Sequence, residues 1–148
     1  MTEVLFYHLQ RQPLEAVLPG LLEKTLERNW RAVVQAGSAE RVAALDAHLW
    51  TYTDESFLPH GTDAEPDGQA IVLTAGDGNP NGATVRFFVD GTVPVDAAGY
   101  ERVVIIFDGN DPAALESARG AWRSLVAEGH AATYWQQNGE GRWEKRAG

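Results

Sequence analysis

The sequence contains no cysteine in 148 residues. This absence excludes disulfide bonds, thiolate zinc sites and cysteine nucleophiles, and it fits a protein kept in a reducing compartment. Long apolar runs are also missing, because no stretch approaches the roughly 20 residues that a membrane-spanning helix needs. The opening residues, MTEVLFYHLQRQ, lack the basic segment and apolar run that mark a secretory signal. We therefore expect a cytoplasmic protein that makes no contact with a membrane.

Basic residues are scarce. The chain has 12 Lys and Arg against 21 Asp and Glu, which gives a formal charge of −9 and a pI near 4.8. Clustered Lys and Arg supply the affinity of proteins for phosphate backbones, so this balance opposes direct contact with nucleic acid. A hydrophobic content of 44% and a length of 148 residues are typical of one folded domain.

Short apolar runs alternate with segments of helical periodicity along the chain. We expect helices at residues 14–26, 39–50 and 112–128, and strands at 4–9, 31–36, 70–74, 85–89, 102–107 and 131–136. Residues 51–69 are predicted to form a loop, and residues 138–148 a short polar tail. Strands that alternate with helices predict an α/β protein, a single three-layer domain over residues 1–148 with a largely parallel sheet and helices on both faces.

Nucleotide-binding loops are absent, although sheets of this kind often bind nucleotides beyond the carboxyl ends of their strands. The first strand is followed by His8-Leu9-Gln10-Arg11, which has no glycine to let a backbone approach a pyrophosphate. The second strand is followed by Gly37, without a GxGxxG pattern or the lysine of a phosphate-binding loop. We predict a fold that resembles nucleotide-binding domains but has no nucleotide site and no cofactor.

Metal-binding patterns are absent as well. The four histidines, His8, His48, His60 and His130, have neither the HExxH nor the H-x3-H spacing of a zinc site. Residues 77–82, DGNPNG, imitate the start of a calcium loop, but Phe88 stands where that loop needs a bidentate glutamate. We expect a tight polar turn there and no metal site.

Two carboxylates stand at the carboxyl end of a predicted strand, where parallel sheets place functional residues. They belong to the segment Asp108-Gly109-Asn110-Asp111, which precedes a proline. A turn and a helix cap explain this segment, because Asp caps helices and Pro favours the first helical position. The alternative is a small hydrolase or transferase that uses Asp108, Asp111 and His60.

Aromatic and basic residues offer a different kind of site. Trp50 closes the second predicted helix, Phe57 follows in the loop, and the third helix carries Arg119, Trp122 and Arg123. Arg119 and Arg123 share one face of that helix because they are one turn apart. An aromatic pocket edged by arginine suits a peptide that ends in an apolar residue, since arginine can hold the terminal carboxylate through two hydrogen bonds. The alternative is that both tryptophans are core and both arginines solvated.

These residues carry a resemblance that spans nearly the whole chain. The chain resembles the chi subunit of the bacterial DNA polymerase III holoenzyme in Phe6-Tyr7, in Leu45-Asp46-x-x-Leu49-Trp50, in Glu55-Ser56-Phe57-Leu58-Pro59-His60, and in the strand ending at Phe107 with the helix that holds Arg119. The Leu-Trp and Ser-Phe-Leu-Pro-His segments at their fixed separation are the most specific of these matches.

The resemblance implies a replication accessory subunit that has no catalytic activity. It implies that the protein links the clamp loader to single-stranded DNA-binding protein, whose acidic C-terminal tail ends in phenylalanine, and that a small psi-like subunit attaches it to the clamp loader. The family's tail pocket matches Trp50, Phe57 and Arg119, and Trp122 stands where the family offers another aromatic residue.

One position departs from the family pattern. In the family, a lysine one turn before the arginine helps to hold the tail. Here Leu115 and Glu116 stand at that place before Arg119, so Arg123 or Arg41 would have to take the role of the lysine. A third interpretation, direct binding of single-stranded DNA, requires one continuous basic groove built from Lys24, Arg28, Arg31 and Arg41.

Overall fold

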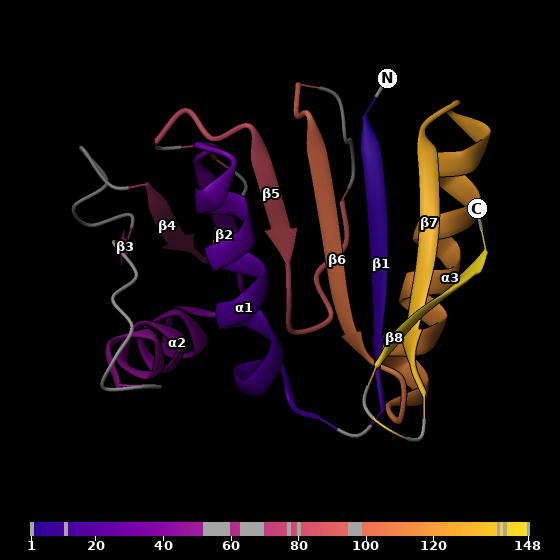
Figure 1. Ribbon diagram of the computed structural model, residues 1–148, viewed down its shortest axis with the longest axis horizontal. Helices are drawn as coiled ribbons and strands as arrows, with labels where there is room; N and C mark the ends of the chain where they lie inside the picture. The colour runs from indigo at the N-terminus through magenta and orange to yellow at the C-terminus, as the bar shows by residue number, and fades with distance from the viewer. Residues whose placement is uncertain are drawn as a thin grey trace.

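The computed structural model of the chain consists of one mixed sheet with helices packed against it (Figure 1). The residues it describes are 2–10, 12–51, 60–62, 70–76, 78–79, 81–94, 99–138, 140 and 142–147. In chain order the elements are β1 (Glu3–Leu9), α1 (Leu14–Glu27), β2 (Ala32–Gln35), α2 (Ala39–Thr51), β3 (His60–Thr62), β4 (Ile71–Thr74), β5 (Val85–Phe88), β6 (Arg102–Asp108), α3 (Pro112–Ala127), β7 (Ala131–Gln137) and β8 (Trp143–Ala147).

The sheet is largely parallel, as the alternation of strands and helices predicts. Its eight strands run in the order β3-β4-β2-β5-β6-β1-β7-β8, and only the β7–β8 pair is antiparallel. β1 lies between β6 and β7, with Phe6 opposite Ile105 on one side and Tyr134 on the other. The prediction of an α/β domain with a largely parallel sheet is confirmed.

Two strands depart from the prediction. β3 occupies residues 60–62 inside the predicted loop, and β8 occupies residues 143–147 inside the predicted polar tail. The turn before β8 is held by Asn138, whose Oδ1 accepts hydrogen bonds from the amides of Glu140 and Arg142 at 2.8 and 3.1 Å. The sequence WEKRA of β8 has no apolar run, and its strand forms by pairing with β7.

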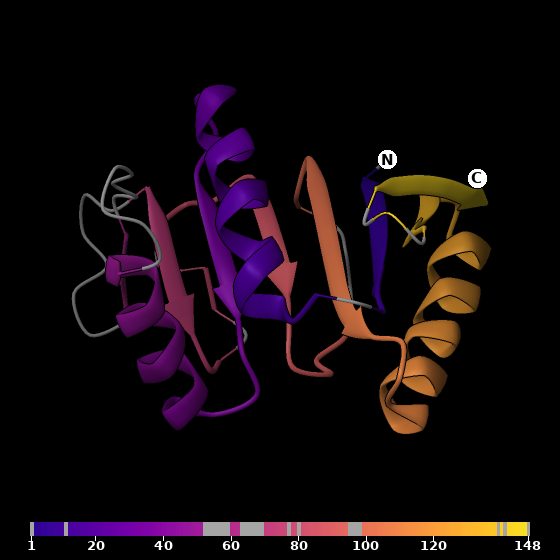
Figure 2. The same ribbon diagram turned by 60° about the horizontal axis from the view of Figure 1, so that its bottom comes forward.

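The helices cover the two faces of the sheet unequally. Along β6, Val104 and Ile106 join the core cluster beneath α1 and α2, on the side that we call face A, whereas Val103, Ile105 and Phe107 join the cluster beneath α3, on face B. Figure 2 shows α2 and α3 near opposite ends of the sheet, with α1 between them. Right-handed crossovers explain this arrangement, because the chain moves one way along the sheet through α1 and α2 and the other way through α3.

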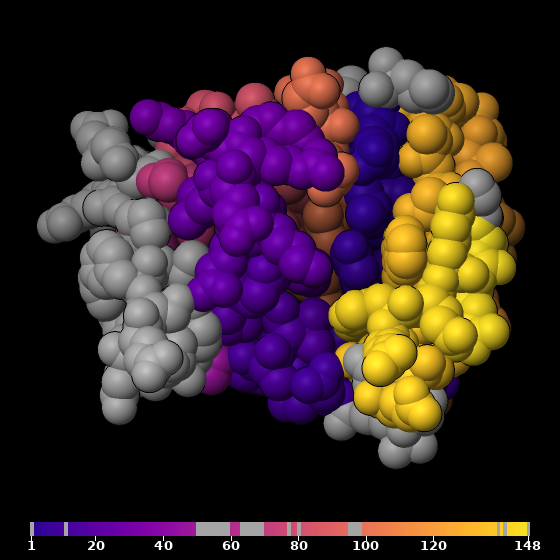
Figure 3. All heavy atoms as spheres, in the orientation of Figure 1, coloured from indigo at the N-terminus to yellow at the C-terminus, as the bar shows by residue number. Residues whose placement is uncertain are grey.

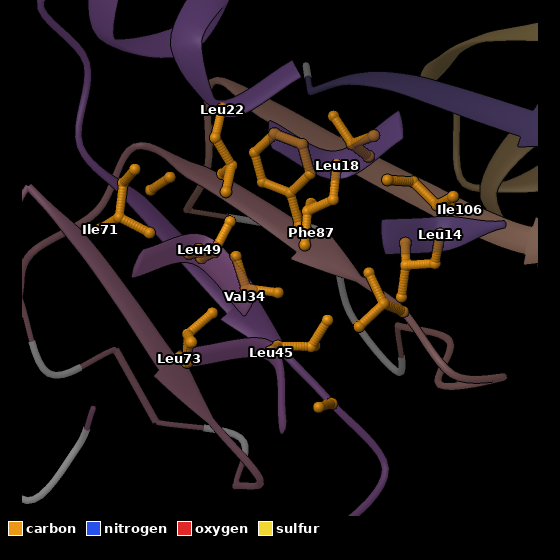
Figure 4. Packing of buried hydrophobic residues seen from close by; sticks show 14 of the residues in the cluster. Leu14, Leu18, Leu22, Val34, Leu45, Leu49, Ile71, Leu73, Phe87 and Ile106 are labelled. Carbon is orange, nitrogen blue, oxygen red and sulfur yellow. The ribbon is translucent and has the colours of Figure 1, made fainter. Parts of the chain in front are cut away.

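The core on face A is built mainly from leucines of the two helices and from strand residues. Figure 4 shows Leu14, Leu18 and Leu22 of α1 directed toward the strands beside Phe87. They recur at intervals of four residues, and each turn of α1 therefore contributes one leucine to this core. No described helix combines the length and apolar character that crossing a membrane requires.

Pro19 lies inside α1 and is buried. Because proline has no amide hydrogen, it leaves the carbonyl of Glu15 without its usual helical donor. His48 Nε2 lies 2.7 Å from this carbonyl oxygen and donates to it from α2. The gap left by proline is thus filled by a hydrogen bond that joins α1 to α2.

None of the described helices lies on face B over β2 and β5, and a buried arginine of β5 organises this part of the sheet. Arg86 is 2% exposed. Its guanidinium donates twice to Gln35 Oε1, at 2.6 and 3.2 Å, and once each to the Gly76 carbonyl at 3.0 Å, the Gly78 carbonyl at 2.7 Å and the Tyr100 hydroxyl at 3.1 Å. All five donors of the side chain are used. Arg86 therefore ties the loop after β4 and the segment before β6 onto the sheet.

Replacement of Arg86 should destabilise the fold strongly. In Arg86→Met, two loop carbonyls and the Gln35 side chain lose a charged donor within the protein, and hydrogen bonds to charged groups contribute about 1.5–3 kcal/mol each. We expect the free energy of unfolding in urea to fall by at least about 3 kcal/mol. Arg123→Met, at an exposed position of α3, is the matched control and should change it by less than about 0.5 kcal/mol. A loss below about 1 kcal/mol for Arg86→Met would contradict this role.

Candidate functional site

A broad depression lies at the carboxyl ends of the strands, where doubly wound folds bind nucleotides. It has a volume of about 920 Å³ and is bounded by the first residues of α1, α2 and α3 and by the ends of β1 and β6. Arg41 is the one Lys or Arg among its described lining residues. The other charged lining residues described are the carboxylates Glu15, Asp90, Asp108 and Asp111.

Arg41 is paired with two of these carboxylates. Its Nε and Nη2 bind the two oxygens of Asp90 at 3.0 Å, and Nη2 also binds Glu15 Oε1 at 3.0 Å. The hydrogen bonds that Arg41 donates to Asp90, and then the one to Glu15, raise the pKa of Arg41 above its usual value. An arginine bound in this way offers little to a phosphate, so the depression is a poor nucleotide site.

The carboxylates and histidine of the hydrolase or transferase alternative do not converge. Asp108 Oδ1 accepts a hydrogen bond from the Asn110 amide at 2.8 Å, and Asp111 Oδ1 accepts one from the Ala113 amide at 3.0 Å. Both are therefore turn and cap residues, as the sequence predicts. His60 lies in β3 at the edge of the sheet, with Nε2 3.2 Å from the Asp46 carboxylate. Asp108, Asp111 and His60 therefore do not form the catalytic group that a hydrolase or transferase would need.

The four basic residues of the single-stranded DNA interpretation are not placed as one groove. Arg41 lies at the carboxyl edge of the sheet, in the depression described above. Lys24 and Arg28 lie at the other end of α1 and line a different groove. Arg31 precedes β2, and its Nη1 donates to the Asn81 carbonyl at 3.2 Å. The continuous basic path that this interpretation requires is interrupted.

The calcium-like segment 77–82 is a polar turn in the part that the structure describes. Asn79 Oδ1 accepts a hydrogen bond from the Ala83 amide at 2.8 Å, and Asn79 Nδ2 donates to the Ala83 carbonyl at 2.9 Å. Gly82 has a φ of +64°, which favours glycine. Across the described residues, no three His, Asp or Glu side chains form a metal-binding group.

Helix α3 brings three of the predicted site residues together. It begins after the Asp111 cap with Pro112 in its first turn, and Ala114, Ala118, Ala121 and Leu125 form its buried side. Arg119 and Arg123 are exposed one turn apart, and Trp122 between them is half-buried. Two exposed arginines one turn apart and a half-buried indole thus lie on neighbouring parts of one helix surface.

Trp122 rests on aromatic side chains of two strands. Its ring meets Phe6 of β1 edge-on at 5.3 Å and Tyr134 of β7 edge-on at 6.0 Å. Aromatic pairs in this geometry fix ring orientation as well as burying area. Tyr134 in turn shares a 2.6 Å hydrogen bond between its hydroxyl and His8 Nδ1. The indole is therefore held by a connected set of rings.

His8 and Tyr134 belong to the site, although the sequence offered no reason to single them out. Burial lowers the pKa of His8 below its ordinary value, and the charge of Arg119 lowers it further, against an opposing effect of Asp108. Burial raises the pKa of Tyr134, and Arg119 opposes that rise. Arg119 therefore acts electrostatically on both groups. Alternation along β1 and β7 is the signal that could have placed them on one face of the sheet.

The helix that holds Trp50 lies on the other face of the sheet from α3. Trp50 lies in the last turn of α2, which packs on face A beside β3 and β4, whereas α3 packs on face B beside β6 and β7. Phe57 lies outside the described residues. The expectation of one pocket that joins Trp50 and Phe57 to Arg119 stays a prediction, and the surface that the described residues form on α3 consists of Arg119, Trp122, Arg123 and Tyr134.

The substituted lysine position lies on the same helix. Leu115 is half-buried and packs against the face B cluster, while Glu116 is exposed in the turn before Arg119. Arg123, one turn after Arg119, is the second exposed cation of this surface. Leu115 and Glu116 thus supply no cation in the turn before Arg119.

Comparison with known proteins points in one direction. The sequence model of the family described as "DNA polymerase III chi subunit, HolC" matches residues 1–133. A curated protein of Rickettsia prowazekii (strain Madrid E), named "Probable DNA polymerase III subunit chi", is 28% identical over 120 residues. That alignment covers 73% of this chain and 71% of the relative.

Gly109 is where the turn before α3 touches the site. A Cβ at this position would lie 1.8 Å from His8 Nε2, so any side chain must displace the imidazole. We expect Gly109→Ala to lower the free energy of unfolding by about 1–3 kcal/mol. Gly120→Ala is the matched control, because no atom lies within 4 Å of its added Cβ and alanine favours a helix. In a His8→Ala background the cost of Gly109→Ala should shrink, and an unchanged cost in that double-mutant cycle would contradict the contact.

The lowered pKa of His8 makes stability depend on pH. The folded protein keeps His8 neutral below the ordinary value of 6.5, while the unfolded chain takes up the proton there. The unfolded state then binds more protons, so stability is present above pH 6.5 and falls as the pH drops through that value. Urea unfolding at pH 7.5 and 5.5 should show a larger loss for the wild type than for His8→Gln. Equal losses in the two proteins would contradict this assignment.

Proposed function

The chain belongs to the DNA polymerase III chi subunit family, and on this premise we propose that it links the clamp loader to single-stranded DNA-binding protein by binding the acidic C-terminal tail of that protein. Chi is an accessory subunit of the replicative polymerase. The proposal adds the tail as ligand, a psi-like subunit as the attachment to the clamp loader, and a role without catalysis.

The surface of α3 carries this proposal. Arg119 and Arg123 are exposed one turn apart on a chain whose formal charge is −9, so they concentrate positive charge where most of the surface is acidic. Half-buried Trp122 and Tyr134 lie beside them. A tail that ends in phenylalanine presents a terminal carboxylate, neighbouring acidic side chains and one aromatic ring. Each of these chemical features has a counterpart on α3.

The support beneath Trp122 favours tight recognition. Phe6 and Tyr134 hold the indole, and the His8–Tyr134 hydrogen bond holds the tyrosine. A surface that is already ordered loses little side-chain entropy on binding. We assign Arg119 and Arg123 to the carboxylates of the tail, and Trp122 with Tyr134 to its terminal ring.

The depression at the carboxyl edge favours a binding protein over an enzyme. Arg41 is bound to Asp90 and Glu15 there, and Asp108 and Asp111 serve the turn and the cap before α3. We therefore propose that this chain acts by binding partner proteins at its surfaces and not by catalysis in this depression.

Calorimetry with a synthetic peptide tests the proposal. The peptide carries several Asp residues and a terminal Phe with a free carboxylate, and titration is done at low salt. Arg119→Ala and Arg123→Ala should each weaken binding at least tenfold, because each removes a charge-assisted hydrogen bond worth about 1.5–3 kcal/mol. Added salt should weaken binding further.

Two controls make the result specific. Arg146→Ala removes an exposed arginine from β8 and should leave the affinity within twofold. The same peptide with an amidated C-terminus should bind more weakly to the wild type, because it lacks the terminal charge. Absence of binding at low salt, or full binding by Arg119→Ala, would refute the tail site on α3.

A further inference from the structure

A groove on face A runs beside α1 over β1 and β6. It has a volume of about 320 Å³, and Leu5, Tyr7, Phe87 and Val104 supply its apolar lining from the strands. Figure 3 shows β1 and β6 visible at its floor between α1 and the C-terminal strands. The groove faces away from α3 and shares no lining residue with the proposed tail surface.

β1 lies at the floor of the groove and is less buried than is usual for a strand with parallel neighbours on both sides. β1 pairs in parallel with both β6 and β7, and such strands are normally buried on both faces. On face B its side chains Val4 and Phe6 are 0% exposed, whereas on face A Leu5 and Tyr7 are only half-buried. Among the described residues, a helix covers β1 on face B, whereas on face A β1 is covered in part by Trp143 and by no helix.

Aromatic rings border the groove on the side of the C-terminal strands. The ring of Tyr7 stacks on Trp135 of β7 at 6.5 Å and meets Trp143 of β8 edge-on at 4.9 Å. All three rings are half-buried. Half-buried aromatic side chains are the residues that most often supply binding energy when a partner covers them.

Positive charge lies along the α1 side and at the amino end of β6. Lys24 is exposed in the last turn of α1, Arg28 is exposed at the cap that follows it, and Arg102 begins β6. Glu27 is the one carboxylate among the described lining residues, and Arg102 is also paired with Glu3 at 2.6 Å. In a chain of formal charge −9, this apolar groove with three cations is complementary to an acidic partner.

We propose that this groove docks an amphipathic helix of a partner protein, apolar on one side and acidic along its flanks. The helix would complete the layer that α1 begins, lying over Leu5 and Tyr7 with its carboxylates near Lys24 and Arg28. β1 has seven residues, so its length of about 23 Å matches a helix of roughly 15 residues. A protein that links two others needs a second surface, and in this respect the inference rests on the proposed function.

A helix suits the groove better than a nucleic acid strand. The floor is formed by aliphatic and aromatic side chains of the sheet, which an apolar helix face would bury. A phosphate backbone would gain from the three cations but would leave that floor in water and approach Glu27. The partner helix gains from both the floor and the charges.

Fluorescence anisotropy with a designed peptide tests the groove. The probe is a fluorescein-labelled, end-blocked 18-residue helix with leucines at intervals of three and four residues and glutamates on the flanks, and a second probe has lysine in place of every glutamate. The glutamate probe should bind the full chain at least tenfold more tightly than the lysine probe. The double variant Lys24→Glu/Arg28→Glu, at two exposed positions, should weaken the glutamate probe at least tenfold.

The matched control has the same charge change on the other face. Arg119→Glu/Arg123→Glu should leave the glutamate probe within twofold while it abolishes binding of the phenylalanine-ended tail peptide, so failure of either site is distinguishable from failure of the other. Equal binding of the two helical probes, or equal weakening by the two double variants, would overturn the proposal. If an oligothymidylate displaced the glutamate probe, the groove would be a site for single-stranded nucleic acid and the proposal would be overturned. If the chain formed a dimer that Lys24→Glu/Arg28→Glu disrupts, the occupant would be a second copy of the chain and the proposal would again be overturned.

Discussion

A parallel sheet has to be covered on both faces, and this requirement governs the whole molecule. The described chain supplies three helices for eight strands. α1 and α2 cover face A over the strands from β4 to β6, and α3 covers face B over β6, β1 and β7. The described helices leave two areas uncovered, which are face B over β2 and β5 and face A over β1 and β7. The buried arginine of face B and the groove of face A lie in these two areas.

The two areas are treated in different ways. On face B the loops around Gly76 and Tyr100 replace a helix, and Arg86 supplies them with a charged donor at the centre of the sheet. Burying a charge is costly, but five hydrogen bonds to uncharged groups offset that cost and fix the loops in one place. On face A the rings of Tyr7 and Trp143 stay half-buried beside a groove. Face B over β2 and β5 is therefore a closed part of the core, whereas face A over β1 and β7 keeps a surface on which a partner can bind.

The sequence predicted those features that depend on neighbouring residues. The apolar run of β6 and the Asp111-Pro112 start of α3 identify their elements locally, and the spacing of Arg119 and Arg123 places both on one face. β8 was missed because its charged sequence forms a strand only against β7. The placement of α2 and α3 on different faces could not be predicted for a related reason, since the face that a helix covers depends on the direction of its crossover and hence on strand order. His8 and Tyr134 meet only because β1 and β7 are neighbours in the sheet.

The acidity of the chain first argues against any association with nucleic acid, but it does not prevent an indirect one. Charges separated by more than about 10 Å are largely screened at an ionic strength of 0.1 M, so binding depends on the local cations. The α3 arginines and the α1 cations lie on opposite faces of the sheet, with the sheet and one packed helix between them. A helix packed on a sheet adds about 10 Å of thickness, which is at least one screening length. Two acidic partners could therefore occupy the two faces together with little mutual repulsion, and a protein with this distribution of charge can connect them.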